Sequence, residues 1–171
     1  MSTALENRLA RLEAAEAIRA AMFDYAAAVD AGHIDEAVQL YVPDVAWSGA
    51  NMPFGTGKTL TLSGREQVAK MLSKLPAGSF RHHALNMTVD VDDDATSASS
   101  RALMLVVSRS PSSPDKAMVL GGLYRARWVR AANLWQVETW HVSNQWLVDG
   151  TDVAFFNAVD AWAETAVEAR P

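Results

Sequence analysis

The feature that most constrains the fold is a change of apolar periodicity partway along the chain. Up to about residue 75, apolar residues recur at spacings of three and four, the period of helices that face a core. From residue 79 to residue 148 the period becomes two, as in strands with one buried face. Helices followed by a run of strands predict an α+β fold. We expect a curved antiparallel sheet, covered on one face by helices, that forms a half-open cone around a pocket.

The predicted elements alternate with Gly-, Pro- and Asp-rich breaks. Helices are expected over the ranges 5–31, 34–41, 65–74 and 152–168. Strands are expected over the ranges 45–48, 79–91, 96–109, 117–130 and 134–148, and part of 49–63 can pair as a further strand. The sequence contains no repeat, linker or low-complexity segment, so residues 1–171 are predicted to form a single domain.

Composition excludes several classes of function. The chain of 171 residues has a net charge of −5 and a pI near 5.3, without a Lys/Arg cluster, which argues against nucleic acid and anionic membranes as partners. It has no cysteine and no closely spaced histidine ligand set, so we expect neither a metal nor another cofactor. With no signal-like or membrane-spanning run, a cytoplasmic protein is expected.

Two polar side chains stand in the Ala- and Val-rich last part of the first predicted helix. Tyr25 and Asp30 lie among Ala and Val residues, where a phenol and a carboxylate need partners. The best candidates downstream are the adjacent histidines at 82 and 83. A carboxylate that accepts a hydrogen bond from an imidazole fixes its tautomer, as in acid–base dyads. We therefore predict a proton-transfer site at the bottom of an apolar pocket, in which Tyr25 binds a substrate oxygen or leaving group.

The order of these motifs resembles the SnoaL-like family of the nuclear-transport-factor-like α+β cone superfamily. Four segments carry the resemblance: Tyr-x4-Asp-Ala-Gly from Tyr25, Pro-Asp-x-x-Trp ending at Trp47, Gly-Arg-Glu from residue 64, and His-His-x-x-Asn-x-x-Val-x-Val-Asp from His82. Its relatives include scytalone dehydratases, bile-acid 7α-dehydratases, hexachlorocyclohexane dehydrochlorinases and ketosteroid isomerases. The resemblance implies the catalytic positions Asp30 and His82 or His83. The isomerases' general-base Asp would fall near Ser48, so that chemistry is not implied.

Adjacent histidines on a strand face opposite sides, so only one of the pair can enter the pocket. Alternation with Leu85, Met87 and Val89 favours His83. The spacing His-x-x-x-Asn, similar to that of the dehydrochlorinases, favours His82, whereas the spacing to the end of the strand, similar to that of the bile-acid dehydratases, favours His83. A β-bulge can reconcile either choice. We favour His82 and retain both.

Three further residues are candidates for substrate binding. Trp47 matches a pocket tryptophan of the dehydrochlorinases and is expected in the pocket wall. His141 and Ser143 share the alternation of Trp135 and Val137 on the last predicted strand, so they are placed at the mouth of the cone. Trp140, Asn144 and Trp146 then occupy the opposite face, where two tryptophans suggest a subunit interface.

The resemblance implies a small cofactor-free lyase or isomerase, dehydratase- or cyclase-like, for an apolar polycyclic, terpenoid or polyketide-like substrate. The expected partners are that substrate or ligand and further copies of the chain, as a dimer or trimer. Two alternatives stay open, because this scaffold hosts unrelated activities. One is a non-catalytic module for hydrophobic-ligand binding or assembly, and the other is an accessory protein similar to dioxygenase β-subunits.

Overall fold

A computed structural model describes residues 3–52, 55–110 and 113–152. Three helices and a six-stranded sheet form an α+β fold, as predicted. The helices are α1 (Thr3–Ala31), α2 (Ile34–Ala37, continued by the 3₁₀ turn Val38–Leu40) and α3 (Arg65–Leu72). The strands are β1 (Tyr41–Ala50), β2 (Thr59–Ser63), β3 (Phe80–Val91), β4 (Ser97–Ser110), β5 (Ser113–Ala131) and β6 (Leu134–Asp152). The helix predicted over 152–168 lies outside the described residues, apart from Asp152, which ends β6.

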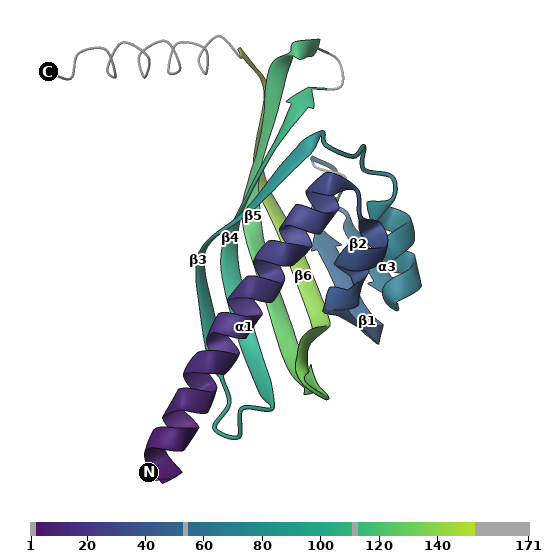
Figure 1. The fold of residues 1–171 in the computed structure, drawn as a ribbon. Helices are drawn as coiled ribbons and strands as arrows, with labels where there is room; N and C mark the ends of the chain where they lie inside the picture. The colour runs from purple at the N-terminus through teal and green to yellow at the C-terminus, as the bar shows by residue number, and fades with distance from the viewer. Residues whose placement is uncertain (1–2, 53–54, 111–112, 153–171) are drawn as a thin grey trace, which may run out of the picture.

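The sheet is open and strongly twisted, with the strand order β2-β1-β6-β5-β4-β3. Figure 1 shows α1 running along one face of the sheet, against β3, and α3 lying beside β1 and β2. One correction concerns strand direction: β1 pairs with β6 in parallel, so the sheet is mixed, although every other pair is antiparallel. The other face of the sheet carries no helix of the described chain (Figure 1).

The segment around Pro43 differs most from its prediction. The second helix was expected to reach Tyr41, but β1 already begins there. The β1–β6 ladder is interrupted between Tyr41 and Ala46, and this gap accommodates a proline, which has no N–H to donate. The Tyr41 carbonyl instead accepts hydrogen bonds from Arg65 Nε at 3.0 Å and Gln136 Nε2 at 3.4 Å. Side-chain donors thus replace the missing ladder contacts at the start of β1.

The core lies between α1 and the covered face of the sheet. Its largest fully buried side chains include Tyr41, Trp128 and Trp140, which pack with Ile18 and Met22 of α1. The apolar residues of α1 divide in two: Ala14, Ile18, Met22 and Val29 are buried, whereas an N-terminal group is exposed. That group consists of Leu5, Leu9 and Leu12, which are 53%, 48% and 61% exposed. No described helix is both long and apolar enough to cross a bilayer.

Candidate active site

Asp30 owes its position to the end of α1. The helix stops two residues later at Gly32, whose φ of +80° is the left-handed conformation that favours glycine. Gly32 N–H donates to the Val29 carbonyl at 3.0 Å, and His33 N–H donates to the Ala28 carbonyl at 2.8 Å. The Asp30 carbonyl accepts from Gly78 N–H at 2.8 Å, which ties the helix end to the segment that leads into β3. Asp30 is therefore held beside the first residues of β3.

The predicted carboxylate–imidazole pair is formed with His82. His82 Nδ1 lies 2.5 Å from Asp30 Oδ1, and the His82 backbone N–H donates to Asp30 Oδ2 at 2.9 Å. Both side chains are largely buried, with 15% of the Asp30 side chain and 16% of the His82 side chain exposed. A carboxylate accepts and does not donate, so Nδ1 carries the proton and Nε2 keeps a free lone pair. The Asp30 carboxylate thus fixes the tautomer of the His82 imidazole.

His83 lies on the opposite, exposed face of β3. The alternation that favoured it fails because β3 contains a bulge between Leu85 and Thr88. Asn86, with φ +50°, takes the extra position, and this returns Met87 and Val89 to the face of His82. The helix-facing residues are therefore Phe80, His82 and Ala84 before the bulge, and Met87, Val89 and Val91 after it. The spacing from the histidines to Asn86 and their spacing to the end of the strand favoured different histidines because the bulge adds one residue to the strand.

His82 and Tyr25 line a hollow of about 150 Å³ on the helix side of the sheet. Its wall is mostly apolar and aromatic, and the Trp140 ring contacts the rings of Tyr25 and Tyr124. Trp47, as predicted, is one of the lining residues. The described residues that line it are Tyr25, Trp47, Met52, Met71, Leu72, Leu75, Phe80, His82, Met104, Val106, Leu120, Tyr124, Trp140, Val142 and Asn144.

The tyrosines of this hollow are held neutral. Burial raises the pKa of Tyr25 to about 12, with the Tyr41 hydroxyl partly opposing the shift. Burial also raises the pKa of Tyr124, and the neighbouring Tyr25 and Asp30 add to that rise. Deeper in the core, burial raises the pKa of Tyr41 well above its usual range. At neutral pH these phenols are hydrogen-bond donors, and Tyr25 and His82 line the same hollow.

Two buried donors form no hydrogen bond of ordinary geometry within the described part of the chain, although each lies near the phenol oxygen of a neighbouring tyrosine. They are the Tyr41 hydroxyl and Trp47 Nε1–H. Unpaired buried polar groups are costly, and in folded proteins they are concentrated where a ligand or water completes them. Trp47 Nε1 is itself shielded from the hollow, although the Trp47 side chain helps to form its wall.

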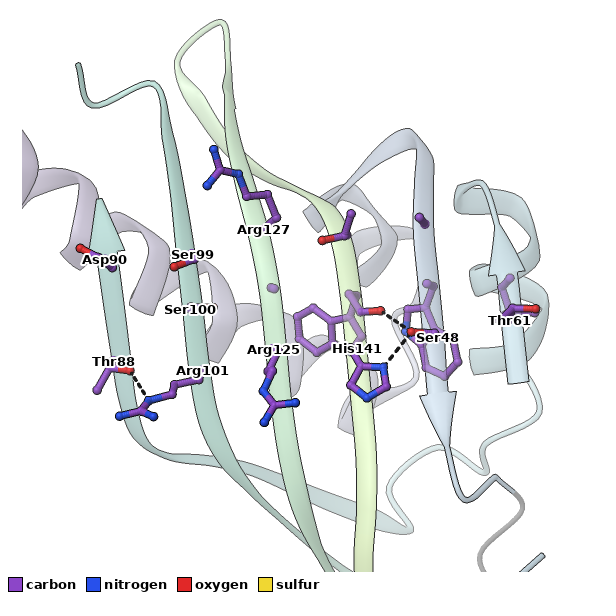
Figure 2. A pocket seen from close by; sticks show the side chains of 16 residues that line it. Ser48, Thr61, Thr88, Asp90, Ser99, Ser100, Arg101, Arg125, Arg127 and His141 are labelled. Atoms are coloured by element: carbon purple, nitrogen blue, oxygen red, sulfur yellow. Dashed lines mark hydrogen bonds between the residues drawn. The ribbon is translucent and has the colours of Figure 1, made fainter. Parts of the chain in front are cut away.

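The predicted placement of His141 and Ser143 at the mouth of the cone is wrong. A bulge at Glu138, between the pairs Trp128–Val137 and Arg127–Thr139, reverses the alternation along β6. His141 therefore lies on the sheet face away from the helices, where Nδ1 is 2.8 Å from Ser48 Oγ (Figure 2). Ser143, two residues further along β6, lies on the same outer face as His141.

The same bulge turns two residues that the sequence placed outside toward the helices. Trp140 is buried and Asn144 is 9% exposed, and both line the hollow. A second register shift, at Gln145, leaves Trp146 on the outer face, where its ring packs on Gly121. The sequence carried one usable signal for Trp140: a fully buried aromatic residue fits better than a histidine on the core side of a central strand.

No three His, Asp or Glu side chains of the described ranges come close enough together to hold a metal ion. The polar groups of the hollow are one imidazole with its carboxylate, phenols, an amide and an indole. This donor set suits proton transfer and hydrogen bonding to a largely apolar molecule.

Comparison with known proteins places this geometry in a family. The sequence profile of the SnoaL-like domain matches residues 10–141, which include Asp30, His82 and most of the hollow. The chain belongs to the SnoaL-like family. No curated protein sequence matches it. Family membership agrees with the resemblance carried by the Asp30 and His82 motifs, and it makes an enzyme plausible without naming a reaction.

Solved structures confirm the SnoaL-like fold. A Novosphingobium aromaticivorans protein provisionally assigned as a scytalone dehydratase is 23% identical, with a TM-score of 0.68 over 87% of this chain and 97% of that one. The type 3 hexachlorocyclohexane dehydrochlorinase LinA of Novosphingobium barchaimii is 18% identical, with a TM-score of 0.66 over 83% and 93%. An NTF2-like protein with a cystatin-like fold, also from N. aromaticivorans, is 20% identical, with a TM-score of 0.68 over 84% and 90%. At these identities the likeness shows the fold alone.

Proposed function

We propose that this SnoaL-like protein is a cofactor-free lyase or isomerase that uses His82 as a general base. The observation that supports it best is the Asp30–His82 pair, with Nδ1 and Oδ1 2.5 Å apart at the edge of an apolar hollow. The carboxylate fixes the imidazole tautomer and stabilises the imidazolium that forms when Nε2 takes a proton. Such a pair, buried among apolar and aromatic side chains, has the composition of a proton-transfer site.

In the proposed reaction, Nε2 of His82 abstracts a proton from a carbon atom of the substrate. The electron pair of the broken C–H bond becomes a carbon–carbon double bond, and a leaving group on the neighbouring carbon departs with its own bonding pair. The Tyr25 hydroxyl, kept neutral by burial, donates a hydrogen bond to that leaving group or to a substrate oxygen. Return of the proton to another carbon atom would give an isomerase with the same residues.

The dimensions of the hollow support an apolar cyclic substrate. A cavity of about 150 Å³ lined by apolar side chains holds a molecule about the size of benzene. The names of two structural neighbours, a dehydratase and a dehydrochlorinase, both describe elimination from a carbon skeleton. A ring that carries a hydroxyl or halide next to an acidic C–H is the part of the substrate that we place in the hollow. A larger polycyclic or terpenoid molecule would extend through the opening.

The test is turnover of a panel of cyclic alcohols and halides, with loss of water or hydrogen halide followed by mass spectrometry. General acid–base catalysis contributes about 10²–10⁴ in rate, so Asp30→Asn and His82→Ala should each lower kcat by about that factor. His83→Ala is the matched control, since His83 is adjacent but lies on the exposed face. Equal loss in all three variants, or undiminished turnover in His82→Ala, would contradict the mechanism. A molecule that binds in the hollow and is recovered unchanged would favour the non-catalytic alternative.

A further inference from the structure

A second hollow, of about 850 Å³, lies on the outer face of the sheet and is lined by polar side chains (Figure 2). Ladder pairing aligns five of them across five strands. Thr88 pairs with Arg101, Arg101 with Arg125, Arg125 with His141, and His141 with Ser48. We call these residues the arginine row. The sheet separates it from the internal hollow of the proposed active site.

The arginine row places two like charges directly opposite each other. Such cross-strand pairs are destabilising unless a counter-charge is present. Arg101 Nε donates to Thr88 Oγ1 at 3.2 Å, a neutral acceptor. Arg125 forms no hydrogen bond or ion pair with any described residue. The opposed guanidinium groups thus lack an anionic partner within the described chain.

Neighbouring charges do not neutralise the row. Arg127, two residues along β5, is matched by Asp92, whose Oδ2 lies 3.1 Å from Arg127 Nη2. Asp90 is the one acidic residue among the described lining residues, and it forms no salt bridge with Arg101 or Arg125. The hollow is therefore locally cationic on a chain whose net charge is −5. This local reversal of charge attracts a small anion to the row.

We propose that the arginine row binds the phosphate group of a small molecule or free phosphate. A phosphate carries a charge of roughly −1.5 to −2 at pH 7, enough to balance two guanidinium groups, whereas a carboxylate balances one. Each planar guanidinium can donate two parallel hydrogen bonds to two oxygens of one phosphate. His141 lies at the next position of the row, with Nδ1 engaged by Ser48 Oγ, which leaves Nε2 for the bound group. Figure 2 shows Arg101, Arg125 and His141 side by side on successive strands.

The experiment is an NMR titration of the full ¹⁵N-labelled chain with inorganic phosphate at constant ionic strength. We expect saturable shifts of Arg101 and Arg125 Nε–H. Arg125→Gln and Arg101→Gln should each weaken phosphate binding by about tenfold or more, the effect of losing a charge-assisted hydrogen bond. Arg130→Gln is the matched control, because Arg130 is exposed on the same strand but lies outside the hollow. Binding that is equal in Arg125→Gln and wild type would overturn the proposal, as would no binding at all.

Two further measurements separate a phosphate site from a site for any small anion and from a contact with a second copy of the chain. Acetate should bind at least about tenfold more weakly than phosphate, and equal binding would refute a site built for a dianion. In phosphate-free buffer, Arg125→Gln should be no less stable than wild type, and added phosphate should raise the Tm of wild type only. A lower oligomeric mass in Arg125→Gln would mean that carboxylates of a second copy occupy the row, and this too would overturn the proposal.

Discussion

Asp30 holds His82 at two points, since its two oxygens accept from the imidazole and from the backbone N–H of the same residue. The second bond fixes the strand relative to the helix end, and the first fixes the ring relative to the strand. A substitution at Asp30 therefore changes both the charge and the position of the imidazole. Tyr25 lines the same hollow but forms no hydrogen bond with Asp30 or His82, so a substitution at Tyr25 leaves the contacts of the pair in place.

Tyr25→Phe should lower kcat by about fivefold while KM changes little. The phenyl ring of the variant still fills the place against Tyr41 and Trp140, whose ring centroids lie 5.6 Å and 5.4 Å from that of Tyr25, and only the hydroxyl is lost. One neutral hydrogen bond is worth about 1 kcal/mol, or somewhat less than a factor of ten. Steady-state kinetics on the substrate found in the panel provide the measurement. An unchanged kcat would show that Tyr25 only packs.

For single residues, the sequence predicted that a carboxylate would pair with an imidazole, but it did not predict on which face of the sheet each side chain lies. Asp30 and Tyr25 were recognisable because a carboxylate and a phenol stood in an Ala/Val-rich helix. His82 could be narrowed only to a pair, and His141 and Ser143 were placed on the wrong face. Single inserted residues at Asn86 and Glu138 decide these cases. A bulge leaves residue types unchanged and reverses every side chain beyond it, so simple alternation cannot reveal it.

Among the elements, the end of α1 matters most for the site. Gly32 has φ +80°, and a Cβ added there would meet the Ala77 Cβ at 2.6 Å, so alanine is both strained and in contact with its neighbour. Gly32→Ala should lower the free energy of unfolding by about 2–3 kcal/mol and loosen the Asp30–His82 contact. Gly78→Ala is the control: its φ is +74°, but a Cβ there meets nothing within 4 Å, so about 1–2 kcal/mol is expected. Urea unfolding measures both, and equal losses would exclude the Ala77 contact as a cause.

The bounds of the long strands were predicted closely because turn residues separate long runs of period two, even though bulges shift the alternation within β3 and β6, whereas the start of β1 was not predicted. Pro43 and Asp44 read as the end of a helix, but the gap in the β1–β6 ladder places them within a strand. Side-chain hydrogen bonds from Arg65 and Gln136 to the Tyr41 carbonyl compensate for that gap. Arg65 and Gln136 are 24 and 95 residues from Tyr41 in the chain, so no local sequence pattern predicts these hydrogen bonds.

For the whole molecule, the buried tyrosines make the free energy of unfolding fall as the pH rises into the alkaline range. An unfolded tyrosine ionises near pH 10, whereas the pKa of Tyr25 in the folded chain is about 12. The unfolded state therefore loses its proton first, and the stabilisation from Tyr25 is complete below pH 10 and is lost as the pH rises to 12 and beyond. This amounts to about 2–3 kcal/mol, and Tyr41 and Tyr124 act in the same direction. Urea unfolding from pH 8 to 11.5 should show a decline that is shallower in Tyr25→Phe; identical slopes would contradict this assignment.

A homo-oligomer stays a prediction for this SnoaL-like chain. Exposed apolar side chains at the start of α1 and on the outer sheet face are consistent with it, and Leu85, Leu103 and Trp146 are each more than 40% exposed. The outer face is divided, however, because the apolar residues Leu85 and Leu103 pair next to the arginine row. Assembly through the apolar part and binding of an anion at the row are separate properties of one surface.

The measurement that tests the central claim most directly needs no substrate. Long-range ¹H–¹⁵N NMR correlations distinguish the two neutral tautomers of a histidine, at about pH 9 where an ordinary imidazole is uncharged. With Asp30 Oδ1 as the acceptor, His82 should be protonated at Nδ1 and bare at Nε2, while His83, outside the hollow, should show no such preference. In Asp30→Asn this preference should weaken or disappear. A wild-type His82 protonated at Nε2 would contradict the proposed base.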